Sequence, residues 1–178
     1  MRLALKLHPD SRCSAVTRID VDVARPATGR LLLSYIVGGE ISDLRLPPVT
    51  TSARADELWR HTCFEAFIRP APGDAYYEFN FAPSTEWATY GFTGYRDGMR
   101  IAQEIAATWI DAQTAPQCYS LRAALDLPDA FPESTFRLGL SAVVEEVGGN
   151  KSYWALAHPH GKPDFHHPNC FVYELPAA

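Results

Sequence analysis

Residues 56–96 read DELWRHTCFEAFIRPAPGDAYYEFNFAPSTEWATYGFTGYR and carry the clearest structural signal in the chain. Side chains alternate over residues 63–68 and again over residues 76–81, and a period of two residues predicts β-strands. Residues 69–74 separate these strands with two prolines and a Gly-Asp pair, which favours a turn. The two strands are therefore expected to form a hairpin.

A third strand is predicted over residues 87–95, beside this hairpin. Three adjacent antiparallel strands would gather acids, an amide and an aromatic ring on one face of the sheet. The residues expected there are Glu65, Glu78 and Asn80, close to Trp87 or Tyr95. Such a face is either solvated surface or a recognition platform.

The alternation continues on both sides of this stretch. It predicts strands over residues 3–7, 16–23, 30–37, 119–125, 136–144, 152–158 and 170–175. Residues 30–37 are apolar on both faces, which predicts a central strand covered on both sides. Residues 99–112 fit either a helix or an irregular stretch with a strand near 107–113. Residues 42–56 and 128–132 are expected to be loops.

This pattern gives ten or eleven strands without a repeating βα unit. It predicts an all-β fold of two packed antiparallel sheets, a β-sandwich or jelly roll, in a single domain over residues 1–178. The 14 prolines and the apolar fraction of 47% suit such a fold better than a helical bundle.

Charge and targeting signals narrow the classes of partner. A net charge of −5 and only three lysines argue against nucleic acid, which needs clustered basic residues. No apolar run reaches the length of a membrane span, and no signal peptide is recognisable, so a soluble, cytoplasmic protein is expected. The widely spaced Cys13, Cys63, Cys118 and Cys170 are expected to be free thiols.

The polar and aromatic residues of the central stretch suit a sugar site. Flat rings stack on the apolar face of a pyranose, while acids, amides and arginine bind its hydroxyls. The candidate ligand-binding residues are Trp59, Arg60, Glu65, Glu78, Asn80, Trp87, Tyr95 and Arg96, with His158, Asp164 and His166 from a later loop. The alternative is that the rings belong to the core and the acids to the solvated surface.

The later loop is rich in histidine. It carries His158, His160, Asp164, His166 and His167, which could hold a divalent metal or supply an axial haem ligand, with His61 as a further candidate. The alternative is a structural loop fixed by its prolines. If the loop lies at the rim of the sugar site, its histidines would tune binding between pH 5 and 7.

The sequence does not predict hydrolase activity, although one carboxylate pair is compatible with it. Glu65 and Glu78 could form a glycosidase carboxylate pair, since cross-strand neighbours lie close enough. Acids on adjacent strands are also common on solvated faces. The chain lacks a GxSxG nucleophile elbow and a glycine-rich phosphate loop.

Three segments resemble the DOMON-like family, which is related to family-nine carbohydrate-binding modules. They read LWRHTCFEAFI, YYEFNFAPSTEWATYGFTGYRDGM and YWALAHPHGKPDFHHPNCFVYEL. The resemblance implies a non-catalytic β-sandwich of jelly-roll kind whose relatives bind sugars or haem. It implies that Trp59 with Glu65, and Trp87 with Arg96, are candidate parts of a sugar site. For haem it implies Met or His ligands, and the chain offers only Met1 and Met99 as methionines.

The sequence therefore predicts a non-enzymatic module that binds a small polar ligand, a saccharide above all, without a cofactor. The alternative is a haem- or metal-binding protein of electron-transfer or sensing type. The identity of the ligand and the oligomeric state are not specified by the sequence.

Overall fold

The computed structural model describes residues 1–27, 29–105, 108–127 and 135–175. This part of the chain forms twelve strands and three short 3-10 helices. The strands are β1 (Arg2–Leu7), β2 (Val16–Ala27), β3 (Arg30–Gly39), β4 (Cys63–Pro70), β5 (Tyr76–Phe81), β6 (Trp87–Phe92), β7 (Arg100–Ile101), β8 (Trp109–Ala115), β9 (Cys118–Asp126), β10 (Phe136–Glu145), β11 (Lys151–Ala155) and β12 (Tyr173–Leu175). The helices are η1 (Ile41–Asp43), η2 (Leu58–Arg60) and η3 (Pro168–Cys170).

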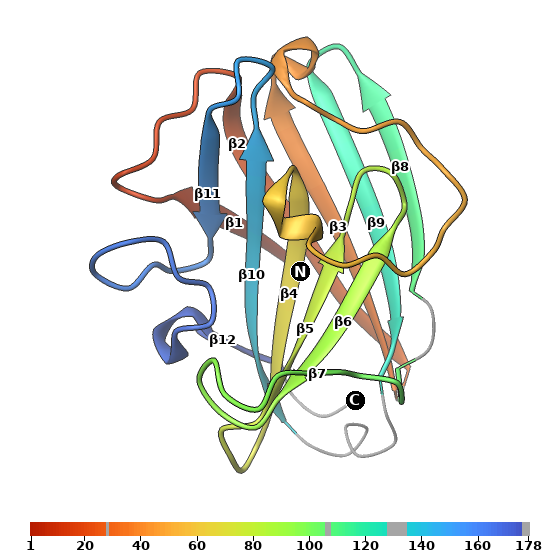
Figure 1. Ribbon diagram of the computed structural model, residues 1–178, viewed down its shortest axis with the longest axis vertical. Coiled ribbons are helices and arrows are strands. Elements are labelled where there is room, and N and C mark those ends of the chain that lie inside the picture. The colour runs from red at the N-terminus through yellow and green to blue at the C-terminus, as the bar shows by residue number, and fades with distance from the viewer. Residues whose placement is uncertain (28, 106–107, 128–134, 176–178) are drawn as a thin grey trace.

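The strands pair in the order β7-β6-β5-β4-β10-β11-β1-β2-β3-β9-β8, with β12 beside β10, and these pairings are antiparallel. The sheet curls at β1, so that β2, β3, β9 and β8 form one layer behind β10, β4, β5 and β6 (Figure 1). The predicted all-β antiparallel sandwich is confirmed.

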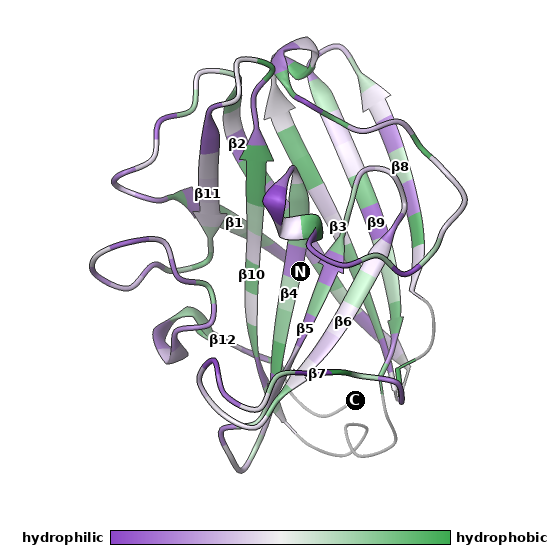
Figure 2. Cartoon of the chain, viewed as in Figure 1, coloured by the Kyte–Doolittle hydropathy of each residue, from purple (hydrophilic) through white to green (hydrophobic). Residues whose placement is uncertain are grey.

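Apolar side chains of the two layers meet in the core. Tyr35 of β3 lies against Phe64 of β4, with ring centroids 5.1 Å apart, and Phe64 stacks on Tyr119 of β9 at 5.8 Å. The Tyr35 hydroxyl donates a hydrogen bond of 2.7 Å to the backbone carbonyl of Glu65, which links the layers. In Figure 2, apolar and polar residues alternate along β8, as expected for a strand with one inner face, whereas the upper part of β10 is continuously apolar.

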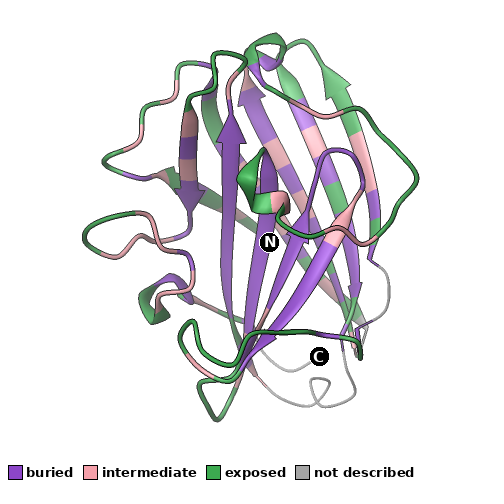
Figure 3. Cartoon of the chain, viewed as in Figure 1, coloured by how far each residue is buried: buried purple, intermediate pink, exposed green. Residues whose placement is uncertain are grey.

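The two layers differ on their outer faces. Strands β4, β5 and β10 are buried along almost their whole length, whereas β3, β8 and β9 alternate between buried and exposed residues (Figure 3). A second cluster of buried apolar residues covers the outer face of the front layer: Phe67, Tyr76, Ala88, Tyr90, Phe92, Val143, Ala155, Phe165 and Phe171. The prediction that residues 30–37 are covered on both sides was wrong, because Leu32 is 37% exposed and only the inner face of β3 is fully buried.

Several strand boundaries differ from the prediction. The third strand of the central stretch ends at Phe92 rather than at residue 95, because a turn closes there between Gly94 and Asp97. The segment near 107–113 is strand β8, Trp109–Ala115, and the last strand starts only at Tyr173, because Pro168 begins the helix η3. The predicted loop over residues 128–132 lies outside the described residues.

No helix in the described part of the chain is long and apolar enough to cross a membrane. The four cysteines are free thiols, as predicted.

Candidate ligand-binding site

The strand register assembles a polar centre on the outer face of the front layer. Glu65 of β4 lies opposite Asn80 of β5, and Glu78 of β5 lies between Phe67 of β4 and Tyr90 of β6. Because strand side chains alternate, all five point to the same side of the sheet. The prediction that Glu65, Glu78 and Asn80 share one face is confirmed.

A cavity of about 500 Å³ opens over this centre. Its lining comes from the strands β4, β5, β6, β10 and β11, from η2 and from the loops that follow β6 and β11. The lining residues are Trp59, Arg60, Glu65, Phe67, Glu78, Tyr90, Phe92, Arg96, Met99, Val143, Lys151, Tyr153, Pro163, Phe165 and His166. Cavities of this size with aromatic walls and few polar groups are the usual form of small-molecule sites.

The two carboxyl groups at the floor are almost fully buried. Glu65 accepts a hydrogen bond of 2.9 Å from the Ser141 hydroxyl, and Glu78 accepts one of 2.8 Å from the Asn80 amide. Burial raises the pKa of Glu65 to about 8, with a further contribution from the nearby charge of Glu78. Burial likewise raises the pKa of Glu78 to about 7, opposed by the Asn80 hydrogen bond. At neutral pH the pair therefore holds at least one proton.

His166 lies above these acids inside an aromatic box. Its ring meets Phe67 and Phe92 edge to face, with centroids 5.1 Å away in both cases. Its Nδ1 lies 2.8 Å from the Tyr76 hydroxyl, and its Nε2 lies 3.7 Å from a Glu78 carboxyl oxygen. Burial lowers the pKa of His166 to about 4, and the charge of Arg96 acts in the same direction.

These contacts favour one tautomer of His166. The Tyr76 hydroxyl accepts a hydrogen bond of 3.3 Å from the Arg96 backbone N–H, and its own proton can be donated to Nδ1 of His166. In that arrangement the ring proton lies on Nε2, which faces Glu78.

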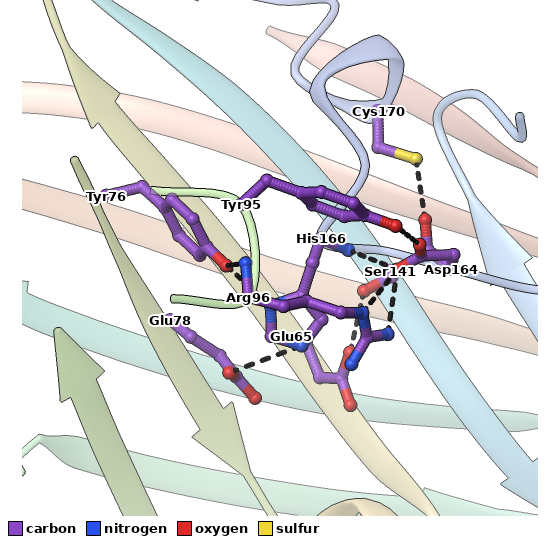
Figure 4. A network of polar contacts seen from close by, with 9 residues as sticks. All are labelled: Glu65, Tyr76, Glu78, Tyr95, Arg96, Ser141, Asp164, His166 and Cys170. Atoms are coloured by element: carbon purple, nitrogen blue, oxygen red, sulfur yellow. Dashed lines mark hydrogen bonds and ion pairs between the residues drawn. The ribbon is translucent and has the colours of Figure 1, made fainter. Parts of the chain in front are cut away.

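A latch joins the two loops over the cavity. Arg96 donates hydrogen bonds of 2.8 and 3.2 Å to Asp164, and the Tyr95 hydroxyl donates to the same carboxylate. Burial acts to raise the pKa of Asp164, but the hydrogen bonds from Tyr95 and Arg96 outweigh it, and the pKa is lowered. Figure 4 shows this latch on one side of the polar network and Glu65 and Glu78 on the other.

The backbone at the latch is strained. Arg96 has a φ of 53°, in the left-handed region that non-glycine residues seldom occupy. This conformation turns its N–H to Tyr76 and its side chain to Asp164. Strained backbone held by surrounding contacts is a frequent feature of binding sites.

The rim of the cavity carries a Trp with basic neighbours. Trp59 in η2 is 44% exposed, and the Arg60 guanidinium lies 5.5 Å from its ring centroid. Arg60 also forms an ion pair of 2.7 Å with Glu57, and Lys151 of β11 donates a hydrogen bond to the Arg60 carbonyl. An exposed Trp above a concave aromatic surface is suited to stacking on a ligand.

The cavity gathers six of the candidates predicted from the sequence: Trp59, Arg60, Glu65, Glu78, Arg96 and His166. Asn80 lies beneath the floor without exposure, and Tyr95 and Asp164 form the latch. The expectation for Trp87 was wrong. It pairs with Phe81, and its side chain packs against the core on the opposite face, because Ala88, Tyr90 and Phe92 occupy the phase that faces the acids.

The other histidines considered as ligands contact different parts of the protein. His158 Nε2 lies 2.8 Å from the Lys6 carbonyl, and its ring packs against His8 and behind Phe165, without lining the cavity itself. His167 accepts a hydrogen bond from the Asn169 backbone at the start of η3. His61 lies 2.7 Å from Glu145. Within the described ranges, no group of three or more His, Cys, Asp or Glu side chains is arranged to hold a metal ion.

The pH dependence of ligand binding is expected to come from Glu65 and Glu78 rather than from the histidines of the loop. The lowered pKa of His166, about 4, keeps this ring neutral between pH 5 and 7, and the pKa of His158 is lowered by burial as well. The cavity groups whose charge changes near neutral pH are Glu65 and Glu78.

Sequence reasoning missed nine of the lining residues: Phe67, Tyr90, Phe92, Met99, Val143, Lys151, Tyr153, Pro163 and Phe165. Three of them carried a usable signal. Phe67 alternates in phase with Glu65, and Tyr90 and Phe92 alternate in phase with each other on the strand beside Glu78. The others depend on how loops fold over the sheet.

The Tyr76 hydroxyl is expected to stabilise the loops over the cavity. Tyr76→Phe removes the partner of both His166 Nδ1 and the Arg96 N–H, so we expect the free energy of unfolding to fall by about 1–2 kcal/mol. Urea unfolding measures this change. Tyr77→Phe is the matched control, because its hydroxyl donates to Glu104 at the surface. Equal losses in the two variants would contradict the role given to Tyr76.

Comparisons with known proteins address the fold. No protein-family model and no curated protein matches the sequence. Among solved structures, the chain is similar to a candidate carbohydrate-binding protein from Bacteroides uniformis, with 16% sequence identity and a TM-score of 0.67, over 96% of this chain and 84% of that chain.

Two structures of a carbohydrate-binding module of family 9 from Caldicellulosiruptor kristjanssonii also match over 88% of this chain. The complex with cellotriose has 10% identity over 74% of its length, and the complex with glucose has 12% identity over 76%, both with a TM-score of 0.47. The likeness to the Bacteroides protein concerns the fold. Membership of the DOMON-like family stays a prediction.

Proposed function

We propose that the cavity binds a small saccharide without catalysing a reaction on it. One observation carries the proposal: rings of Phe67, Tyr90, Phe92 and Trp59 surround a floor of hydrogen-bonding side chains within one cavity. Aromatic faces cover the apolar face of a sugar ring, and carboxyl groups at fixed positions bind its hydroxyls. The Bacteroides protein with the same fold is described as a candidate carbohydrate-binding protein, and the proposal extends that role to this chain.

The position of the acids supports binding rather than hydrolysis. A glycosidase places one carboxyl group at the leaving oxygen and the other across the sugar ring, on opposite sides of the scissile bond. Glu65 and Glu78 come from adjacent strands of one sheet face, and both approach a ligand from the floor. The proposal therefore assigns no bond cleavage to this pair.

Haem suits the cavity less well than a sugar. His166 and Met99 both line it, which is the combination that favours a haem ligand set. However, Nδ1 of His166 is hydrogen-bonded to Tyr76, and Nε2 faces the Glu78 carboxyl at 3.7 Å, so neither nitrogen is presented to open space.

The cytoplasmic location and the single-domain organisation stay predictions.

Calorimetric titration with a panel of mono- and oligosaccharides tests the proposal. We expect Trp59→Ala to weaken binding roughly tenfold or more, equivalent to about 1.4 kcal/mol, because the ring that stacks on the ligand is lost. Trp109→Ala is the matched control, since Trp109 is also exposed and also lies near an arginine, but on β8 of the other layer. No heat from any sugar, with unchanged Trp fluorescence, would refute the proposal.

A further inference from the structure

The carboxyl groups at the cavity floor have no arginine or lysine as an ion-pair partner among the residues that the structure describes. Glu65 and Glu78 are only 3% and 5% exposed, yet each has one carboxyl oxygen without a hydrogen-bond partner among the described residues. A buried carboxyl group avoids the cost of an unpaired charge either by pairing with a cation or by keeping its proton, and the raised pKa values of Glu65 and Glu78 show that this pair keeps protons until a cation arrives. The free oxygens belong to side chains that line the cavity, so a ligand can reach them.

The basic residues of the cavity are engaged elsewhere. Arg96 pairs with Asp164, Arg60 pairs with Glu57, and Lys151 donates to a backbone carbonyl at the rim. His166 is the nearest nitrogen base, at 3.7 Å from Glu78, and its low pKa of about 4 leaves it neutral. Thus no arginine or lysine among the described residues forms an ion pair with Glu65 or Glu78, although the charge of Arg96 acts on both acids and opposes the rise of their pKa.

The walls above the floor also favour a positive charge. Phe67, Tyr90, Phe92, Tyr153 and Phe165 line the same cavity, and the faces of aromatic rings attract ammonium groups. Carboxyl groups below and rings around form the environment in which a desolvated ammonium is most stable. A neutral hydroxyl group is stabilised less than an ammonium group, both by the carboxyl groups and by the aromatic rings.

We infer that the ligand carries a protonated amine, placed at the floor between Glu65 and Glu78, so that the saccharide is an amino sugar. The sugar part of this inference rests on the proposed function, whereas the amine part rests on the unpaired acids and the rings. With the ammonium at the floor, the sugar hydroxyls face the latch and the rim, where Arg60 and Lys151 lie.

Ligands that differ only in the amine provide the first test. Calorimetry at pH 6.5 compares glucosamine and galactosamine with N-acetylglucosamine and glucose, and adds cyclohexylamine as an amine that is not a sugar. We expect each amino sugar to bind at least tenfold more tightly than its neutral counterparts. Equal or tighter binding of the neutral sugars overturns the inference but leaves the proposed function standing.

The other outcomes separate the two claims. Binding of cyclohexylamine without binding of any sugar supports the amine and overturns the saccharide. Absence of binding by every compound overturns both claims. Neither result depends on a variant that has to fold.

Isosteric variants provide the second test. Glu65→Gln and Glu78→Gln keep the size of each side chain and an acceptor for Ser141 or Asn80, but remove the charge. We expect the roughly tenfold preference for an amino sugar over its neutral counterpart to disappear in these variants, because the charge that attracts the ammonium is lost. Glu104→Gln is the control, because Glu104 pairs with Arg100 outside the cavity. A preference that survives in both cavity variants contradicts the inference.

Proton release gives an independent readout. Since Glu65 and Glu78 have pKa values of about 8 and 7, both are largely protonated at pH 6.5, and an ammonium that ionises the pair should expel about one to two protons per ligand. Titrations in two buffers of different ionisation enthalpy measure this number. The other titratable and charged groups around the pair are Tyr35, Arg60, Cys63, Tyr76, Tyr90, Arg96, Lys151, Tyr153, Asp164 and His166. Zero release in the wild type contradicts the placement of the amine.

Discussion

The free energy of unfolding is expected to fall by on the order of 2 kcal/mol between pH 6.5 and 8, because the folded protein retains protons that the unfolded chain has lost. An unfolded glutamate titrates near pH 4.5, whereas Glu65 and Glu78 in the folded protein titrate near 8 and 7. Between these values the folded state binds more protons, so its stability decreases as pH rises. The decrease ends about one pH unit above the pKa of Glu65, where that group has lost its proton in the folded state too.

His166 changes the free energy of unfolding in the opposite direction, and at lower pH. Its pKa is about 4 in the folded protein and 6.5 ordinarily, so the unfolded state binds more protons between these values. Stability from His166 therefore rises with pH up to about 6.5 and is constant above it. Measurements between pH 6.5 and 8 isolate the acids from this effect.

The double variant Glu65→Gln/Glu78→Gln should lose this decrease. At pH 8 we expect it to be more stable than the wild type by about 1–3 kcal/mol, since each retained proton is worth about 1.4 kcal/mol per pH unit. Urea unfolding at pH 6.5, 7.2 and 8 measures both proteins. Glu104→Gln is the control, because hydrogen bonding to Arg100 already lowers the pKa of Glu104 to about 2. A wild type as stable at pH 8 as at pH 6.5 would show that the acids are ionised and solvated.

Loss of the Arg96 side chain is expected to weaken sugar binding at least tenfold. Arg96→Ala removes two hydrogen bonds to Asp164 and leaves a largely buried carboxylate with Tyr95 as its side-chain donor. Removing hydrogen bonds to a buried charged group costs about 1.5–3 kcal/mol, so the loop over the cavity should also lose stability.

Calorimetry and hydrogen exchange of the loop over residues 158–167 measure the two effects of Arg96→Ala. Arg100→Ala is the matched control, since Arg100 is equally exposed and also ion-paired, but does not line the cavity. We expect it to change affinity less than twofold. Similar losses in both variants would mean that the latch has no special role.

Much of the fold was accessible from the sequence because alternation reports strand faces directly. Residues 63–68 and 76–81 became β4 and β5, and the phase of Glu65, Glu78 and Asn80 fixed the floor of the cavity. The loops could not be derived in this way. The loops over residues 93–99 and 158–167 meet because of the turn between Gly94 and Asp97, the left-handed backbone of Arg96 and the ion pair between Arg96 and Asp164.

The aromatic walls show where local patterns mislead. Trp87 and Trp59 were equally plausible stacking residues by composition, but one faces the core and the other the rim. Tyr90 and Phe92 were not among the candidates, because apolar side chains on both faces of a strand indicate burial and do not say what covers it. The covering loops leave a cavity over this face, and the alternation of residue types along the strands does not predict that cavity.

Amide chemical-shift mapping with the tightest-binding sugar of the panel tests the central claim most directly. We predict that shifts change in residues 90–99 and 158–167 and at the Trp59 indole, which surround the cavity over Glu65 and Glu78. A second cavity of about 580 Å³ lies elsewhere, beside Leu46, Pro48 and Tyr119. Changes confined to that cavity, with none around Glu65 and Glu78, would contradict the proposed site.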